Sequence, residues 1–287
     1  SLRIRSIFVM KKLIVSGDSF TDDGFISDWH PELDTSYAKW PEHLGKHLGM
    51  EVINLARMGV GNSFIYSSLQ DALMQIPKEE IGLVIAGWTQ SHRKDWEEGT
   101  NEHYPYKEFS VSPWRSRRVD QDGDIVHFVR KSLRTYIAFQ NLCENNNIPY
   151  YHFQMIELFE NFIYGLKPNH NNEKDTNKHN GNKSKDIQKI LDLYKQYNPH
   201  IKNFLGWPGI SARFILYMNT GIWHEEDIKF KAQKEFVTRS FTMDSKILGT
   251  DYDFRVRKGL VISDKDEHPN EHGHKAIADF IIQILKL

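Results

Sequence analysis

Two short polar segments, far apart along the chain, carry residue types that together can perform nucleophilic catalysis. The first, Gly17-Asp18-Ser19-Phe20, follows the apolar run 12–16, which we predict to be a buried strand. A tight turn there would hold the Ser19 hydroxyl at the carboxyl edge of a parallel sheet, where open α/β sheets place their sites. Backbone N–H groups beyond it would favour a developing oxyanion. The alternative is that Asp18 or Ser19 simply caps a helix.

The second segment, 264–270, reads DKDEHPN and precedes a predicted amphipathic helix over 271–285. Its histidine, His268, can act as a general base toward a serine if a carboxylate fixes its tautomer and stabilises the imidazolium. Asp266, two residues earlier, and Asp264, four residues earlier, are the candidate carboxylates. The alternative is an ordinary polar loop that leads into the helix.

The segments between these two motifs alternate between predicted strands and predicted helices. Further strands are predicted at 50–55, 81–86 and 148–153, and helices at 37–49, 62–74 and 129–146. This alternation indicates parallel crossover units. We therefore predict a flavodoxin-like three-layer α/β/α sandwich with a parallel sheet of about five strands. Residues 87–129 show no regular pattern, and 187–197 are expected to form a short helix.

The chain is expected to form one domain over 1–287 with a polar insertion near 165–186. Hydrophobic residues make up 39% of its 287 residues, which is enough for a sizeable core and excludes wholesale disorder. Residues 168–186 contain no aliphatic or aromatic side chain and cannot bury themselves. A basic nucleic-acid arm is the alternative for this insertion, although three acidic residues offset its lysines.

Composition excludes several classes of protein. The 37 Lys and Arg residues against 38 Asp and Glu leave a net charge of −1, so nothing favours nucleic acid or an anionic membrane as partner. The single cysteine, Cys143, excludes an internal disulfide and a four-cysteine zinc site, and we expect it in the core. The apolar run 6–15 is interrupted by lysines and too short to span a bilayer. With no signal peptide or transmembrane segment evident, a cytoplasmic or phage-associated protein is expected.

Together the two polar segments resemble the SGNH hydrolases, also called the GDSL esterase/lipase family. That family carries its nucleophile in an N-terminal Gly-Asp-Ser block, here ending at Ser19, and its base before the last helix, here His268. All four sequence blocks of that family have counterparts here, in the same order along the chain, within residues 12–285. It implies a carboxylic-ester hydrolase that works through a Ser-His-Asp triad and an acyl-enzyme, without cofactor or metal. A small-molecule or carbohydrate ester is the implied substrate, and deacetylation of a carbohydrate is one form of it.

The resemblance also implies which groups stabilise the oxyanion: the backbone N–H groups of Ser19 and Gly59 and a side chain at position 89. The family's third block reads Gly-x-Asn-Asp, whereas 87–90 read GWTQ, so Thr89 stands in place of the asparagine. Losing one such donor typically costs about 10²–10³ in rate. Either Thr89 substitutes in part, or Gln90 or a backbone group takes over, or the enzyme is slow.

The acid of the triad is a second departure. The family usually reads Asp-x-x-His, but position 265 is Lys265. Some relatives look like Asp-x-His-Pro, which favours Asp266, with Asp264 as the alternative acid. The Phe-Leu-Gly-Trp-Pro turn at 204–208 and the Asp-Glu-His-Pro-Asn ending look like SGNH-type proteins found in marine bacteriophages.

Other interpretations of these residues remain open. A metal site is suggested by five potential ligands within eleven residues: Asp264, Asp266, His268, His272 and His274. There is no His-Glu-x-x-His motif, and the resemblance implies a structural role for His274. A dinucleotide site would need a third glycine where the chain has Phe64. Aromatic residues of 88–114 and 204–223 line either a sugar-binding cleft or the core. Finally, the chain can be an inactive binding or structural module that keeps this fold.

Overall fold

The structure is a computed structural model, and it describes most of the chain in several stretches. These are residues 10–91, 93–97, 114–118, 125–156, 189–190, 192–205, 243–248 and 259–287. The predicted polar insertion near 165–186 lies outside the described residues, so the single-domain organisation stays a prediction.

A five-stranded parallel sheet forms the centre of the molecule. Its strands are β1 (Lys12–Ser16), β2 (Glu51–Asn54), β3 (Ile81–Trp88), β6 (Tyr150–Gln154) and β7 (Phe204–Leu205), in the order β2-β1-β3-β6-β7. Counted along the chain within this sheet, the order is 2-1-3-4-5, which is the flavodoxin-like arrangement. The predicted parallel sheet of about five strands is confirmed. The central strands are almost wholly apolar because helices cover both of their faces.

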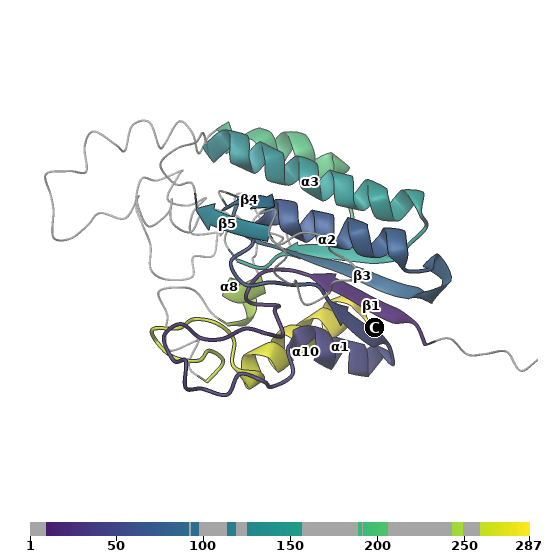
Figure 1. Cartoon of the computed structure of the whole chain (residues 1–287). Helices are drawn as coiled ribbons and strands as arrows, with labels where there is room; N and C mark the ends of the chain where they lie inside the picture. The colour runs from purple at the N-terminus through teal and green to yellow at the C-terminus, as the bar shows by residue number, and fades with distance from the viewer. Residues whose placement is uncertain are drawn as a thin grey trace, which may run out of the picture.

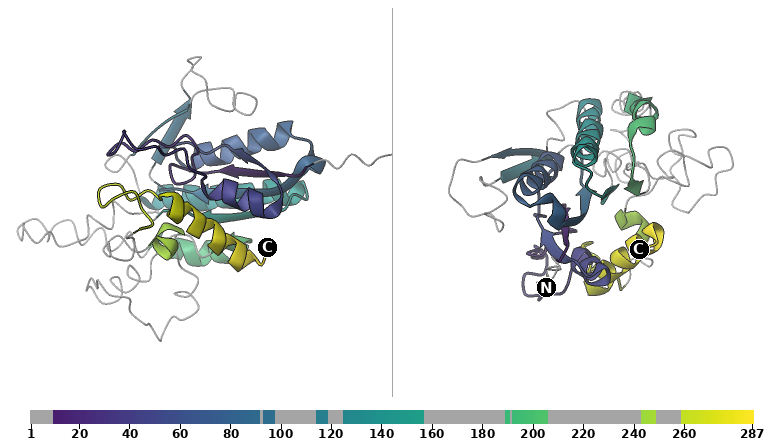
Figure 2. Two further views of the ribbon diagram at one scale, coloured as in Figure 1. Left: turned by 90° about the horizontal axis from the view of Figure 1, so that it is seen from below. Right: turned by 90° about the vertical axis from the view of Figure 1, so that its right-hand side faces the viewer.

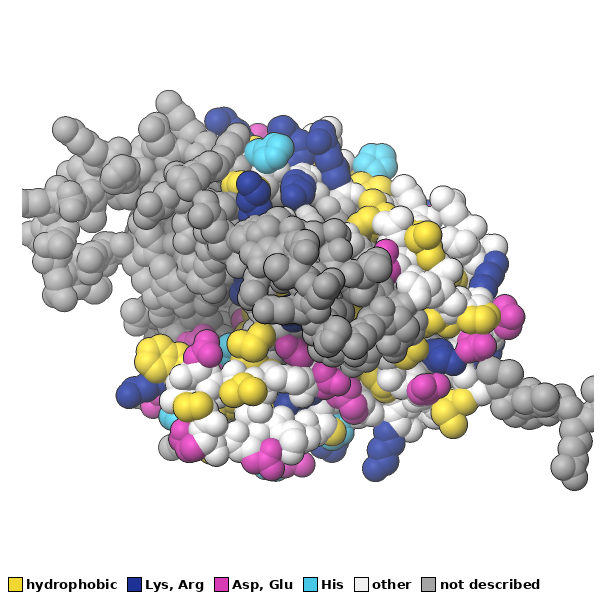
Figure 3. Space-filling view, viewed as in Figure 1, with side chains coloured by type: hydrophobic (Ala, Val, Ile, Leu, Met, Phe, Trp, Pro, Cys, Tyr) yellow, Lys and Arg dark blue, Asp and Glu magenta, His cyan; other side chains and the backbone are white. Residues whose placement is uncertain are grey.

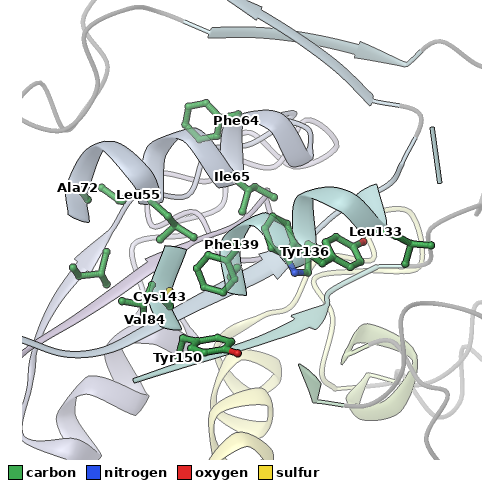
Figure 4. Packing of buried hydrophobic residues seen from close by; sticks show 14 of the residues in the cluster. Leu55, Phe64, Ile65, Ala72, Val84, Leu133, Tyr136, Phe139, Cys143 and Tyr150 are labelled. Atoms are coloured by element: carbon green, nitrogen blue, oxygen red, sulfur yellow. The ribbon is translucent and has the colours of Figure 1, made fainter. Parts of the chain in front are cut away.

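Two helices cover each face of this sheet, as Figures 1 and 2 show. On one face α1 (Trp40–Leu48) packs against α10 (Glu271–Leu285), and on the other α2 (Asn62–Gln75) packs against α3 (Ile125–Asn145). Each pair closes its own apolar layer, and Figure 4 shows the layer between α2, α3 and the sheet. The predicted three-layer sandwich is therefore present.

The shorter elements complete the described part of the chain. They are the 3-10 helices η1 (Lys78–Glu80) and η2 (Asn198–His200), helix α8 (Met243–Ile247), and strands β4 (Arg93–Glu97) and β5 (Trp114–Arg118). Within the segment predicted to form a short helix at 187–197, residues 189–190 and 192–197 are helical.

The irregular structure predicted for 87–129 is wrong in three places. Strand β3 continues to Trp88, and helix α3 begins at Ile125. Between them, β4 and β5 pair in antiparallel fashion as a separate two-stranded ribbon. Their sequences, RKDWE and WRSRR, lack the alternation of apolar and polar residues that identifies a half-buried strand.

Buried aromatic rings and one histidine hold β3, β6 and β7 to helix α3. Trp88 is fully buried and stacks on Tyr136 with ring centroids 4.8 Å apart, so this tryptophan belongs to the core and not to a cleft. Its indole N–H donates to Nδ1 of His152 over 3.1 Å, and Nε2 of His152 lies 2.8 Å from the carbonyl of Lys202. His152 is therefore neutral, with its proton on Nε2.

Acid should destabilise the fold through His152. Burial lowers the pKa of His152 to about 4, whereas the unfolded chain keeps the ordinary value near 6.5. Between these values the unfolded state binds more protons, so the free energy of unfolding falls as pH falls. We expect a loss of about 3 kcal/mol between pH 7 and pH 4 from this group alone. Urea unfolding of wild type and His152→Gln measures it: the variant should lose less stability over this pH range, and equal slopes would contradict the assignment.

Charged side chains are distributed unevenly over the described surface. In the view of Figure 3, basic side chains gather over α3, and acidic ones lie mainly over the lower layer that contains α1 and α10. On this face, the basic and acidic side chains are therefore partly separated. None of the described helices is long and apolar enough to cross a membrane.

Candidate active site

The polar motifs meet in a cavity at the carboxyl edge of the sheet. Ser19 follows β1, Gly59 follows β2, and His268 approaches from the loop before α10. The cavity measures about 450 Å³ and is lined by Ser19, Phe20, Phe25, Asp28, Trp29, Met58, Gly59, Arg93, Ile156, Asp244, Lys265, Asp266, Glu267 and His268. The topology alone brings Ser19 and Gly59 together, since the parallel strands that precede them end at the same edge of the sheet.

The turn that carries Ser19 is held by the aspartate beside it. The Asp18 carbonyl accepts hydrogen bonds from the N–H groups of Thr21 and Asp22, at 2.8 and 3.0 Å. Its carboxylate accepts a further bond from the N–H of Phe20 at 3.1 Å. Asp18 is fully buried, so these hydrogen bonds take the place of the ones that it would make to water in an unfolded chain. The turn therefore presents Ser19 to the cavity in one fixed orientation.

Hydrogen bonds within the loop that carries His268 hold its conformation just before helix α10. The Asn270 side chain caps the helix by accepting from the N–H of Gly273 at 3.0 Å, and it donates to the carbonyls of Gly259 and Val261. The carbonyl of His268 accepts from the N–H of Ile262 at 2.9 Å. These bonds hold the histidine at a constant distance from the start of the helix.

A continuous chain of hydrogen bonds links Ser19, His268 and Asp266. The Ser19 Oγ atom lies 2.8 Å from Nε2 of His268, and Nδ1 of the same ring lies 2.6 Å from Oδ1 of Asp266. Because Nδ1 faces a carboxylate, it carries the ring proton and donates. Nε2 is then unprotonated and accepts from the Ser19 hydroxyl. Asp264 is exposed, and no hydrogen bond joins it to His268 among the described residues.

Asp266 is held as a carboxylate by three donors. Oδ1 accepts from both the Nδ1 and the backbone N–H of His268, and Oδ2 accepts from the hydroxyl of Ser27. Burial raises the pKa of Asp266, but the hydrogen bonds from His268 and Ser27 outweigh it and lower the pKa to about 2. Asp266 therefore remains negatively charged at every pH at which a neutral histidine can act as a base.

Aromatic rings fix the plane of the His268 imidazole. Its ring lies 4.3 Å from that of Phe25, in a stacked arrangement, and 4.6 Å from that of Phe20. Both phenylalanines are buried, so they exclude water from much of the ring. The imidazole keeps its edge, with the Nε2 atom, directed at Ser19.

Two backbone N–H groups are placed to receive negative charge beside Ser19. Among the described residues, no hydrogen bond uses the N–H of Ser19 or of Gly59, and both residues line the cavity. Gly59 has φ of 79°, a conformation that favours glycine, while the neighbouring Met58 N–H donates to the Asp22 carboxylate at 2.7 Å. This arrangement leaves the Gly59 N–H available to a substrate.

Thr89 does not take the place expected for it, and the expectation needs correction. Its hydroxyl donates a hydrogen bond to Oδ2 of Asp18 over 2.6 Å, and the residue is fully buried and absent from the cavity lining. The Thr89 N–H donates to Asn62, and the Thr89 carbonyl accepts from Asn62 and Gln154. The short Thr89 side chain is held by its hydrogen bond to the buried Asp18 carboxylate and does not extend into the cavity. Gln90 is also fully buried.

The remaining histidines of the C-terminal cluster lie apart from this site. His272 is exposed, and His274 is buried with its Nδ1 accepting from the N–H of Trp40 at 3.3 Å. Burial lowers the pKa of His274 well below its ordinary value, so it is a neutral side chain that joins α10 to α1. Within the described ranges, no group of three His, Cys, Asp or Glu side chains is arranged to hold a metal ion. Burial also raises the pKa of the Cys143 thiol to about 12.

Three contributors to the site have no signal in the sequence. Ser27 and Phe25 lie in an irregular loop after the first motif, and Arg93 lies in the ribbon that sequence patterns did not predict. Ser27 reaches Asp266 across 239 positions of the chain. Only the fold brings such residues together, and a single sequence holds no pattern that pairs them.

Comparison with known proteins gives similarity at the level of structure. No family model and no curated protein matches the chain. Among solved structures, it is similar to a putative lipolytic protein of the G-D-S-L family from Desulfitobacterium hafniense, with 12% identity, 96% of this chain and 99% of that chain covered, and a TM-score of 0.43. An acetyl xylan esterase matches with 15% identity over the same shares and a TM-score of 0.40. A lipase from a goat rumen metagenome matches with 10% identity, covering 96% and 97%, and a TM-score of 0.42.

The first of these three proteins carries the name of the family that the sequence motifs resemble. No phage protein is among them, and the phage affiliation stays a prediction.

Proposed function

We propose that this chain is a serine esterase of the SGNH type that hydrolyses carboxylic esters through an acyl-enzyme. The observation that carries the proposal is the hydrogen-bond chain from Ser19 through His268 to Asp266. A serine, a neutral histidine and a buried carboxylate in this order are the parts of a nucleophile that a base can activate. The cavity beside Ser19 gives an ester access to it.

Acylation is the first half of the reaction. Ser19 Oγ attacks the carbonyl carbon of the ester while Nε2 of His268 takes the hydroxyl proton, and the carbonyl electron pair moves onto oxygen. The N–H groups of Ser19 and Gly59 donate to that oxyanion. As the tetrahedral intermediate collapses, the bond to the leaving oxygen breaks and Nε2 returns the proton to the alkoxide. Asp266 stabilises the imidazolium that exists between these two transfers.

Deacylation repeats these steps with water. His268 removes a proton from the water, the hydroxide oxygen attacks the acyl carbon, and the Ser19 oxygen leaves with the proton that Nε2 held. The products are a carboxylic acid and an alcohol, and the enzyme returns to its starting state. Thr89 takes no direct part in this scheme. Its hydroxyl bond to Asp18 instead stabilises the turn that presents Ser19.

A carbohydrate ester is the substrate that we propose within this class. Trp29 lines the cavity with 65% of its surface exposed, which places a large aromatic ring at the opening. Such a ring offers an apolar face to a sugar and costs little conformational entropy to hold. Asp28 lies beside it and can accept hydrogen bonds from sugar hydroxyls.

Release of acetate tests the proposed activity and the proposed substrate together. We expect turnover of p-nitrophenyl acetate and faster turnover of an acetylated oligosaccharide, because the sugar adds contacts at Trp29. Trp29→Ala should lower kcat/KM about 10-fold for the oligosaccharide only, corresponding to loss of one stacking contact of roughly 1.4 kcal/mol. Equal losses for both esters would contradict the sugar contact. If the protein turns over neither of the two esters, the esterase activity is contradicted and the inactive binding module is favoured.

A further inference from the structure

One cationic side chain lies in the cavity wall next to the loop that contains Gly59. Arg93 lines the same cavity as Ser19, Gly59 and His268. Its Nη1 atom donates to the carbonyl of Val60 at 3.0 Å, one residue beyond Gly59. Its Nε atom donates weakly to Oε1 of Gln90 at 3.4 Å. The guanidinium therefore bridges the loops after β2 and β3, which are the two loops expected to supply oxyanion donors.

The strand that carries Arg93 is fixed to the start of helix α2. The Asp95 carboxylate accepts from the N–H of Gly61 at 2.6 Å and from the N–H of Phe64 at 3.0 Å. A negative side chain is favourable at this helix end, because the exposed N–H groups there carry partial positive charge. These two bonds hold β4 against the loop that contains Gly59, so the position of Arg93 is set by the fold.

Gly61 allows this close approach. A Cβ atom added at Gly61 would lie 3.0 Å from both the Cβ and the carbonyl oxygen of Arg93, and 2.8 Å from the Asp95 carboxylate. Backbone atoms cannot yield as the tip of a flexible side chain can, so a larger residue would displace β4. The absence of a side chain at Gly61 thus serves the placement of Arg93.

We propose that Arg93 is a catalytic residue whose guanidinium stabilises the oxyanion in place of the missing third-block side chain. The inference rests on the proposed esterase function. Thr89 donates to Asp18 and lies outside the cavity lining, so it gives no hydrogen bond to the substrate. Of the other Lys and Arg residues among the described ones, only Lys265 lines the cavity, and it lies on the His268 loop and not beside Gly59.

The chemistry requires no proton from Arg93. During attack, the electron pair of the carbonyl bond moves to oxygen, and a full positive charge near that oxygen lowers the energy of the transition state more than that of the neutral ester. A guanidinium stays protonated at all working pH values and offers donors in a fixed fork. It can therefore hold the Val60 carbonyl and face the oxyanion with the same planar group.

The test is the kinetics of Arg93→Met on a small neutral ester such as p-nitrophenyl acetate. We expect kcat to fall about 10²-fold with little change in KM, since the charge acts on the transition state and the ester carries none. Arg93→Lys should recover part of kcat. Lys94→Met is the matched control, because Lys94 is the exposed neighbour on the same strand and does not line the cavity. It should behave as wild type.

Two results would overturn the proposal. One is an unchanged kcat in Arg93→Met. The other is a raised KM with unchanged kcat, which would make Arg93 a substrate-binding group. Gly61→Ala gives a second measurement, since displacement of β4 should lower kcat in the same way while melting temperature reports the fold. The rate of fluorophosphonate labelling of Ser19 separates the two proposals. If wild type is labelled and the labelling rate and kcat of Arg93→Met are unchanged, only this inference is contradicted. If wild type is not labelled, the esterase function is contradicted, and this inference with it.

Discussion

Ser19→Ala should abolish ester hydrolysis while leaving the fold intact. The variant removes the only group that forms the bond to the acyl carbon, so we expect kcat to fall on the order of 10⁶-fold, the size seen when a triad serine is lost. In the described part of the chain, the Ser19 side chain hydrogen-bonds only to His268, and Ser19 is buried. Its removal should therefore change the melting temperature by no more than a few degrees.

Steady-state release of p-nitrophenol measures the effect, with Ser36→Ala as the matched control. Ser36 is an exposed serine on the loop before α1 and does not line the cavity, so its variant should retain full activity. Turnover by Ser19→Ala within 10-fold of wild type would show that another group, or a water, is the nucleophile.

Asp266→Asn should show the second-largest loss. An asparagine keeps the size of the side chain but cannot hold the proton of His268 on Nδ1 as a carboxylate does. The imidazole can then adopt the other tautomer, with its proton on Nε2, and no longer accepts from Ser19. We expect kcat to fall about 10⁴-fold. Circular dichroism confirms that the variant is folded.

Two other variants test the role of Asp266 further. Ser27→Ala removes the hydrogen bond to Oδ2 of Asp266, together with the bond that the Ser27 hydroxyl accepts from the N–H of His30. It should lower kcat about 10-fold, the value of one bond to a charged group. Asp264→Asn should have no effect, because Asp264 is exposed and does not line the cavity. A large loss in Asp264→Asn with a silent Asp266→Asn would assign the acid to Asp264, and silence of both would reduce the triad to a dyad.

The sheet and its helices could be predicted from the sequence because their patterns are local. The apolar runs that became β1, β2, β3 and β6 stand between helices with clear periodicity. The positions of Ser19 and His268 relative to these elements follow from the same patterns. The ribbon β4–β5 could not be predicted, because its mostly polar and charged sequence lacks the alternation of apolar and polar residues that indicates a strand.

The finer parts of the site depend on contacts across the sheet edge. Nothing in the spacing decides between Asp264 and Asp266, since both lie within one short turn of His268. The bond from Thr89 to Asp18 spans 71 positions and is visible only when β1 and β3 are aligned side by side. For the same reason, Arg93 gave no sign of lying beside Gly59.

The most direct test of the central claim is labelling of the folded protein by a serine-directed fluorophosphonate, read by mass spectrometry of its peptides. The hydrogen-bond chain predicts a single adduct on Ser19, which forms much more slowly in His268→Ala because the base is absent. Labelling spread over several serines, or no adduct on Ser19 in a folded sample, would contradict an activated nucleophile at this site.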